Sequence, residues 1–128
     1  MSDKKFVFTI AHVTSNPIEV LGIMKIASNI KAFSDEAEIA IFLIGEGVEL
    51  AKKGVVENIT IEFEGKPVNF GEMLEMLVDF GVKFYVCHAF MPGHGVTQEN
   101  LIQGAEIKSS SYLGELLLKG YIPFSLSI

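Results

Sequence analysis

The order of strand-like and helix-like segments predicts an α/β protein, a three-layer α/β/α sandwich around a mostly parallel sheet of about five strands. Residues 6–11 and 37–44 are almost continuously apolar, which is typical of strands buried on both faces of a parallel sheet. A helical pattern at residues 17–33 separates them. A second helix, at residues 73–80, precedes another buried strand at residues 82–87. Strands that alternate with helices in this way favour parallel pairing through right-handed crossovers.

The start of the first helix is marked by three residues. Asn16 is the expected N-cap, Pro17 occupies the first helical position, and Glu19 lies three residues beyond the cap. We expect this helix to run to about Phe33. Apolar residues surround much of its circumference, so the helix requires cover on two sides. We expect the sheet on one side and a second subunit on the other.

The middle of the chain is less regular. The glycines of residues 45–47 predict a turn, followed by a short helix around residues 48–53 that Gly54 stops. Strict alternation of apolar and polar residues at 59–63, together with residues 68–70, indicates a half-exposed hairpin or an irregular excursion.

Capping residues mark the helices of the second half of the chain. Gly81 and Gly120 are the expected C-terminal stops of two helices, and Thr97 is the expected N-cap of another. After the strand that ends at Cys87, the expected elements are two helices and a closing strand, at residues 97–102, 109–118 and 121–128.

Length and composition limit the function classes. The 128 residues are enough for one domain with a core, spanning 1–128. The hydrophobic share of 49% and mean hydropathy of +0.40 are high for a domain with a limited interior, so we expect a homo-oligomer. The net charge of −6 argues against nucleic acid as a partner, because binding it requires a basic surface. No apolar run approaches the roughly 18 residues that span a bilayer.

A single cysteine and the absence of a signal-peptide pattern favour a reducing, cytoplasmic location. That cysteine, Cys87, ends a buried strand and is followed by His88 and a glycine-containing loop. Reactive groups of α/β proteins collect beyond the carboxyl ends of the strands, and His12 follows the first strand at the same edge. Cys87 is therefore the candidate reactive group.

A reactive thiol is favoured as its thiolate by positive potential or by hydrogen-bond donors. Five candidate binding residues around the thiol are His12, His88, Gly93, His94 and Gly95. The helix N-terminus expected near Thr97 is a further source of donors. Adjacent Cys87 and His88 point to opposite faces of a strand, and the spacing matches no closed zinc pattern, so we predict no metal.

Several familiar chemistries are missing from the sequence. The chain has no GxGxxG, no GxxxxGK[ST] and no CxxC motif, and no acidic residue is positioned to complete a Cys-His-Asp triad. The Thr14-Ser15-Asn16 loop resembles the phosphate loop of flavodoxins only weakly, so no cofactor is predicted. A lone exposed cysteine can still carry a sulfur atom as a persulfide and pass it to a partner thiol. Two alternatives stay open: a non-catalytic oligomeric binding or scaffold module with an inert Cys87, and a nucleotide- or flavin-binding protein.

The chain resembles the DsrE/DsrF-like family of sulfur-relay proteins, of the TusD type. The resemblance rests on "KFVFTIAH", "IFLIGEGVELAKKG", "GVKFYVCHAF" and "LIQGAEIKSSSYLGELL" in this order. It implies a five-stranded parallel sandwich, trimers or hexamers, and sulfane sulfur carried on Cys87 as a persulfide or thiosulfonate. It also implies a TusA-like carrier or a rhodanese-type donor as partner. The loop after Cys87 lacks the second cysteine that some relatives have.

Overall fold

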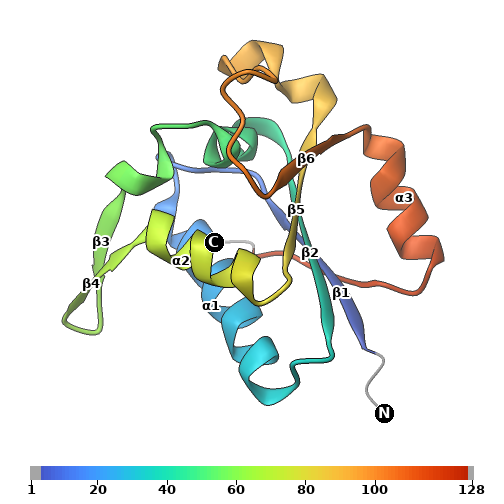
Figure 1. The fold of residues 1–128 in the computed structure, drawn as a ribbon, viewed down its shortest axis with the longest axis horizontal. Coiled ribbons are helices and arrows are strands. Elements are labelled where there is room, and N and C mark those ends of the chain that lie inside the picture. The colour runs from blue at the N-terminus through green and yellow to red at the C-terminus, as the bar shows by residue number, and fades with distance from the viewer. Residues whose placement is uncertain (1–3, 127–128) are drawn as a thin grey trace.

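The computed structural model describes residues 4–126 and confirms the predicted α/β sandwich. Its main sheet has five strands in the order β6-β5-β2-β1-β7, and every neighbouring pair is parallel (Figure 1). In chain order these strands are β1 (Lys5–Ile10), β2 (Glu38–Leu43), β5 (Lys83–Cys87), β6 (Ala105–Lys108) and β7 (Ile122–Phe124). Because all five run the same way, the carboxyl ends of β1, β2 and β5 lie at one edge, as expected.

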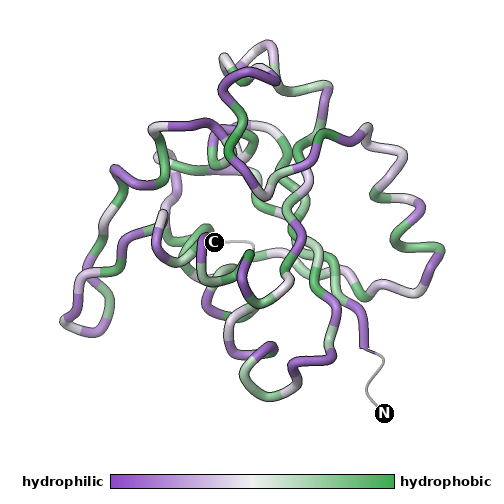
Figure 2. The backbone as a smooth tube through the Cα atoms, in the orientation of Figure 1, coloured by the Kyte–Doolittle hydropathy of each residue, from purple (hydrophilic) through white to green (hydrophobic). Residues whose placement is uncertain are grey.

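The two faces of the sheet are covered unequally. Helices α1 (Pro17–Phe33) and α2 (Phe70–Asp79) pack on one face, and α3 (Ser110–Leu118) covers the other (Figure 1). The chain adds β2, β5 and β6 in one direction and then returns across the sheet to β7. With right-handed crossovers, the returning connection must pass over the opposite face, which explains the position of α3. The central strands are largely hydrophobic, as Figure 2 shows.

Helix α1 has the predicted bounds, but its N-terminus is built differently. The side chain of Asn16 does not cap the helix. Glu19 turns towards the end of β1 instead, where its Oε1 accepts hydrogen bonds from the backbone N–H groups of Ala11 (3.1 Å) and His12 (2.9 Å). The carboxylate is buried and satisfies donors left by the end of the strand.

The segment after β2 forms a 3₁₀ helix, η1 (Gly45–Ala51), that already begins at the glycines expected to form a turn. Gly47 lies so close to β1 that an added Cβ would collide with the carbonyl oxygen of Ile10. The predicted hairpin is present as β3 (Thr60–Phe63) and β4 (Lys66–Asn69), an antiparallel pair separate from the main sheet. A second 3₁₀ helix, η2 (Val56–Asn58), precedes it.

Helix α2 begins three residues before the predicted start, because Asn69 caps it: the Asn69 Oδ1 accepts the N–H of Glu72 at 3.0 Å. The helix predicted at residues 97–102 is wrong. Thr97 and Asn100 instead form a turn through reciprocal side-chain to backbone hydrogen bonds. These bonds satisfy the local N–H groups without a helix, which Thr and Asn commonly do.

The hydrophobic pattern of the sequence does not predict strand β6, because the strand has only four residues and contains both apolar and charged side chains. Strand β7 is shorter than the predicted 121–128, and residues 127–128 of that prediction lie outside the described residues. Between residues 4 and 126, none of the helices has the length and apolar character needed to cross a membrane.

Candidate functional site

Cys87 is the last residue of β5, and its side chain lies on the α3 face of the sheet. It packs in a cluster with Phe42, Tyr85 and Leu116, and only 1% of the residue is exposed. The strand end that sequence predicts for this cysteine is present. The covering of the thiol by α3 was not foreseen, because a strand buried on both faces does not reveal which helix lies over which side chain.

The end of β5 lies at a topological switch point. The chain leaving β5 packs on the α1–α2 side, where Met91 and Val96 are buried in the larger core. The chain leaving the neighbouring strand β6 instead enters α3, on the opposite side. Diverging connections from adjacent parallel strands mark the edge of the sheet at which α/β proteins commonly bind ligands. Cys87 lies at this switch point, with its side chain buried.

Lys108 is the register partner of Cys87 on β6, so the two side chains emerge on the same face of the sheet. The Lys108 ammonium lies 4.4 Å from the ring centroid of Tyr112 on α3, and 3.9 Å from a carboxylate oxygen of Glu106. Tyr112 in turn packs edge-on against Tyr85, with ring centroids 5.0 Å apart. A thiol, a cation and two phenols therefore share this face of the sheet near the switch point.

The phenol of Tyr85 is held in its neutral form. Burial raises its pKa well above the ordinary value of 10.0, and hydrogen bonding to Tyr112 raises it further. Lys108 is the one cationic side chain that the described strands β5 and β6 present on this face near their carboxyl ends. Its ammonium attracts anionic groups electrostatically.

The loop after β5 forms two short 3₁₀ helices, η3 (His88–Phe90) and η4 (Pro92–His94). His88 is exposed at its start, and Gly93 is exposed with open space around it. Gly95 ends η4 in the left-handed conformation at φ 69°. The buried Met91 fixes this loop to the α1–α2 side, away from the face on which the Cys87 side chain lies.

The two remaining histidines each contact a glutamate. His94 Nδ1 lies 2.7 Å from Glu49 Oε2, and His12 Nδ1 lies 3.3 Å from Glu19 Oε1. Strand β2 separates β1 from β5, which places the end of β1 roughly 10 Å from the end of β5. His12 thus shares an edge with Cys87 but belongs to a different cluster, and the binding roles of both histidines stay predictions.

The loop after β1 has its donors occupied by carboxylates. Glu46 Oε1 accepts hydrogen bonds from the Val13 N–H and the Ser15 hydroxyl, both at 2.6 Å. Burial opposes ionisation of Glu46, but the bonds from Ser15 and Val13 and the nearby His12 outweigh it and hold its pKa below 4.5. A flavin or nucleotide phosphate at this loop would have to displace a stable anion. The geometry therefore gives the flavin alternative no support.

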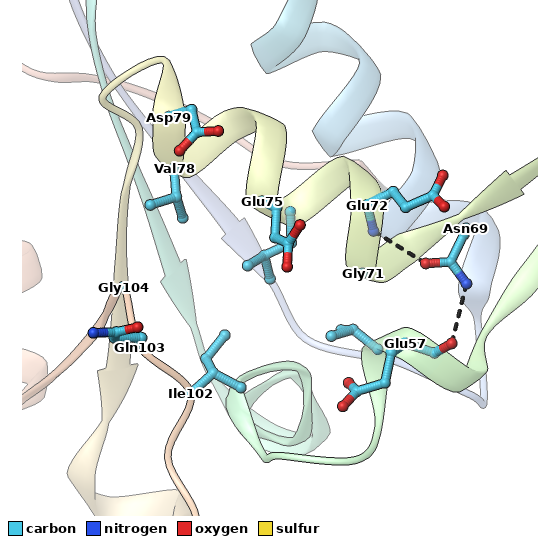
Figure 3. Close-up of a pocket in the computed structure, with 12 residues that line it drawn as sticks. Glu57, Asn69, Gly71, Glu72, Glu75, Val78, Asp79, Ile102, Gln103 and Gly104 are labelled. Atoms are coloured by element: carbon cyan, nitrogen blue, oxygen red, sulfur yellow. Dashed lines mark hydrogen bonds between the residues drawn. The ribbon is translucent and has the colours of Figure 1, made fainter.

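Two further findings concern metal binding and a cavity away from Cys87. Among residues 4–126, no group of three or more His, Cys, Asp or Glu side chains could hold a metal ion. A cavity of about 740 Å³ lies beside α2, on the face of the sheet away from the Cys87 side chain (Figure 3). The cavity and the thiol are separate sites.

The fold and the position of Cys87 define a class of protein: parallel α/β proteins with a cysteine at the carboxyl edge of the sheet. The DsrE/DsrF-like family model matches residues 4–124, and the chain belongs to this family, whose members are generally sulfur-relay proteins. This finding confirms the resemblance in the sequence. A curated relative, the uncharacterized protein MK0008 of Methanopyrus kandleri, is 30% identical over 76 residues. That match spans 59% of this chain and 57% of the relative's length.

Solved structures share the fold at low sequence identity. The chain matches MTH1491 of Methanobacterium thermoautotrophicum, a protein of unknown function, with a TM-score of 0.77 and 17% identity, over 95% of this chain and 98% of that one. It matches the ychN protein of E. coli with a TM-score of 0.72 and 21% identity, over 97% and 100%. BT1422 of Bacteroides thetaiotaomicron, a conserved protein of unknown function, gives 0.68 and 17%, over 96% and 95%.

Sequence reasoning missed Lys108, Tyr112 and the glutamates that hold the histidines. A signal for Lys108 was present: Gly104-Ala105-Glu106 belongs to the segment that carries the family resemblance, and a strand there places every second residue on one face. No comparable signal pointed to Glu49, because its contact with His94 joins positions that are 45 residues apart.

Proposed function

We propose that the protein is a sulfur carrier that accepts sulfane sulfur on Cys87 and passes it to a partner thiol. The observation that carries the proposal is the position of Cys87, at the switch-point end of β5 in a chain of the DsrE/DsrF-like family. The register partner Lys108 adds support, since an ammonium favours the anionic sulfur species of such a relay.

The transfer conserves the oxidation state of the carrier. The Cys87 thiolate attacks the outer sulfur of a donor persulfide, a new S–S bond forms at Cys87, and the donor's S–S bond breaks to release its thiolate. A partner thiolate then attacks the outer sulfur of the Cys87 persulfide. The S–S bond to Cys87 breaks, the sulfur moves to the partner, and Cys87 leaves as the thiolate. A thiosulfonate group transfers in the same way: the Cys87 thiolate attacks the sulfane sulfur of a partner's cysteine thiosulfonate, the partner's cysteine leaves as the thiolate, and the S–SO₃⁻ group stays on Cys87.

Sulfur transfer requires a cover over the thiol to open, because the residue is only 1% exposed. We infer that this cover is α3, which adds Tyr112, Leu113 and Leu116 to the cluster that contains Cys87. A single helix on a five-stranded face is a small cover, and such elements open locally at lower free energy than the core. His88 is exposed and directly follows Cys87 in the sequence, so it is the first candidate to bind an incoming anionic sulfur species. His94 is a further candidate.

Intact mass spectrometry after incubation with a persulfide donor tests the carrier function. The wild-type protein should gain the mass of one sulfur atom, and the gain should reverse when a thiol is added. The Cys87→Ser variant should gain nothing. If wild type gains no sulfur, or if the serine variant gains the same mass, the carrier function is refuted.

We also propose that the carrier works as a homo-oligomer, a trimer or hexamer, with a TusA-like carrier or rhodanese-type donor as its partner. Apolar side chains exposed on α3, Leu117 and Leu118, support a subunit interface at this helix. Ile122 and Phe124 of the edge strand β7 add exposed apolar surface on the other face of the sheet. Leu118, at 90% exposure, is the sharpest case. Light scattering of the purified chain should give the mass of three or six copies, and Leu118→Glu should reduce it.

A second candidate function is a non-catalytic oligomeric scaffold with an inert Cys87. The burial of the thiol among apolar side chains favours it, since buried cysteines often act only as small hydrophobes. Labelling of the native protein with a thiol reagent separates the two. Labelling faster than global unfolding supports the carrier, and labelling that only accompanies unfolding supports the scaffold.

A further inference from the structure

The cavity beside α2 is a groove with an apolar floor and an acidic rim. It lies between α2, η2 and the turn at residues 102–104 (Figure 3). Among the described residues, no lysine, arginine or histidine lines it. The floor is formed by Val56, Leu74, Val78 and Ile102. The rim carries four carboxylates, those of Glu57, Glu72, Glu75 and Asp79.

The carboxylates of α2 are not compensated within the described chain. Glu72, Glu75 and Asp79 are spaced three and four residues apart, which places them on one side of the helix, where like charges repel. Asp79 lies in the last turn, which has no basic residue, so it also opposes the helix dipole. None of the ion pairs formed between residues 4 and 126 includes any of the three. A cationic ligand in the groove would relieve this arrangement.

The walls of the groove are fixed in place. Asn69 joins two of them, because its Oδ1 accepts the N–H of Glu72 and its Nδ2 donates to the carbonyl oxygen of Glu57 at 3.1 Å (Figure 3). Gly71 allows this close approach, since an added Cβ would lie 2.9 Å from the Cα of Glu57. A site held in one geometry loses less entropy when a ligand binds.

We propose that this groove docks a basic, amphipathic segment of a partner protein. Charge complementarity identifies the occupant: lysine or arginine side chains meet the rim carboxylates, and aliphatic side chains between them contact the floor. Because the groove is open along the surface of α2, it fits a stretch of chain. The proposal is independent of sulfur transfer, since the Cys87 side chain lies on the opposite face of the sheet.

Fluorescence anisotropy with a short labelled peptide of alternating lysine and leucine tests the proposal. The test variant is Glu75→Lys with Asp79→Lys. The matched control is Glu62→Lys with Glu115→Lys, which changes the net charge equally at exposed positions outside the groove. The groove variant should bind the peptide at least about ten-fold more weakly than wild type, and the control should bind nearly as wild type does.

A thermal melt separates a binding role from a structural one. Lysines at these positions relieve repulsion along α2 and suit its last turn, so the groove variant should melt no lower than wild type while it loses the peptide. Absence of peptide binding by wild type, equal loss in both variants, or equal binding of a peptide of lysine alone would overturn the proposal. So would a fall in oligomer mass for the groove variant, which would make a second copy of the chain the occupant.

Discussion

Replacing Leu116 by alanine should expose Cys87 to thiol reagents without unfolding the rest of the protein. Leu116 is 2% exposed and is the most deeply buried side chain that α3 contributes to the cluster containing Cys87. If α3 is a cover that opens on its own, weakening its packing raises the open fraction directly. If the cysteine is reached only through global unfolding, any equally destabilising change in the core has the same effect.

The size of the effect follows from the packing. Truncation of a buried leucine to alanine costs about 2–5 kcal/mol. Because α3 has nine residues and is the one described helix of the protomer on this face of the sheet, the lower value of about 2 kcal/mol applies to its detachment. Since 1.4 kcal/mol corresponds to a factor of ten, the open state should become about thirty times more populated. The rate of labelling should rise by the same factor when opening is fast and reversible.

The matched control is Leu77→Ala, the same substitution at a fully buried position of α2, on the opposite face of the sheet. Urea unfolding should show a loss of global stability in both variants. The rate at which a thiol reagent labels Cys87 at neutral pH is measured from the absorbance of the group that the reagent releases. This rate should rise about thirty-fold in Leu116→Ala and little in Leu77→Ala. Equal acceleration in the two would refute local opening and leave Cys87 as an inert core residue.

Three further predictions concern Lys108, Gly47 and Glu46. Lys108→Met should slow the labelling of Cys87 several-fold at neutral pH, whereas Lys108→Arg should not, since the cation favours the thiolate; equal rates would exclude this role. Gly47→Ala should lower the free energy of unfolding in urea by about 2–3 kcal/mol, because its Cβ collides with backbone, whereas Gly93→Ala, with open space around it, should change it by less than about 0.5 kcal/mol. Hydrogen bonds keep the pKa of Glu46 below 4.5, so its carboxylate stabilises the fold above that pH and the contribution is lost as the pH falls through the lowered pKa. Wild type should therefore lose more stability on acidification than Glu46→Gln, and parallel acid curves would contradict this.

Elements with strong local signals were predictable from the sequence. Pro17 fixed the start of α1, and the continuous apolar runs located β1, β2 and β5. The short helix expected at Thr97 is absent, because the Thr97 hydroxyl accepts the N–H of Asn100 and closes a turn instead. Strand β6 is an edge strand of four residues, too short for a hydrophobic period to be read.

The sequence predicts only those parts of the candidate site that depend on local pattern. The position of Cys87 at a strand end follows from local pattern, and so does the shared edge with His12. The surroundings of the thiol depend on long-range packing: strand pairing places Lys108 beside Cys87 in register, and α3, which follows β6, brings Tyr112 to the same cluster. Such contacts leave no periodic trace near Cys87 itself.

The unequal covering of the sheet has a consequence for synthesis on the ribosome. The helix on the Cys87 face of the sheet, α3, follows the cysteine in the chain, whereas α1 and α2 precede it. A growing chain can therefore bury the α1–α2 face first, while the thiol face has no cover until α3 emerges. During that interval the cysteine is open to oxidants and to sulfur donors. The nascent protein is thus the form in which this thiol is most vulnerable.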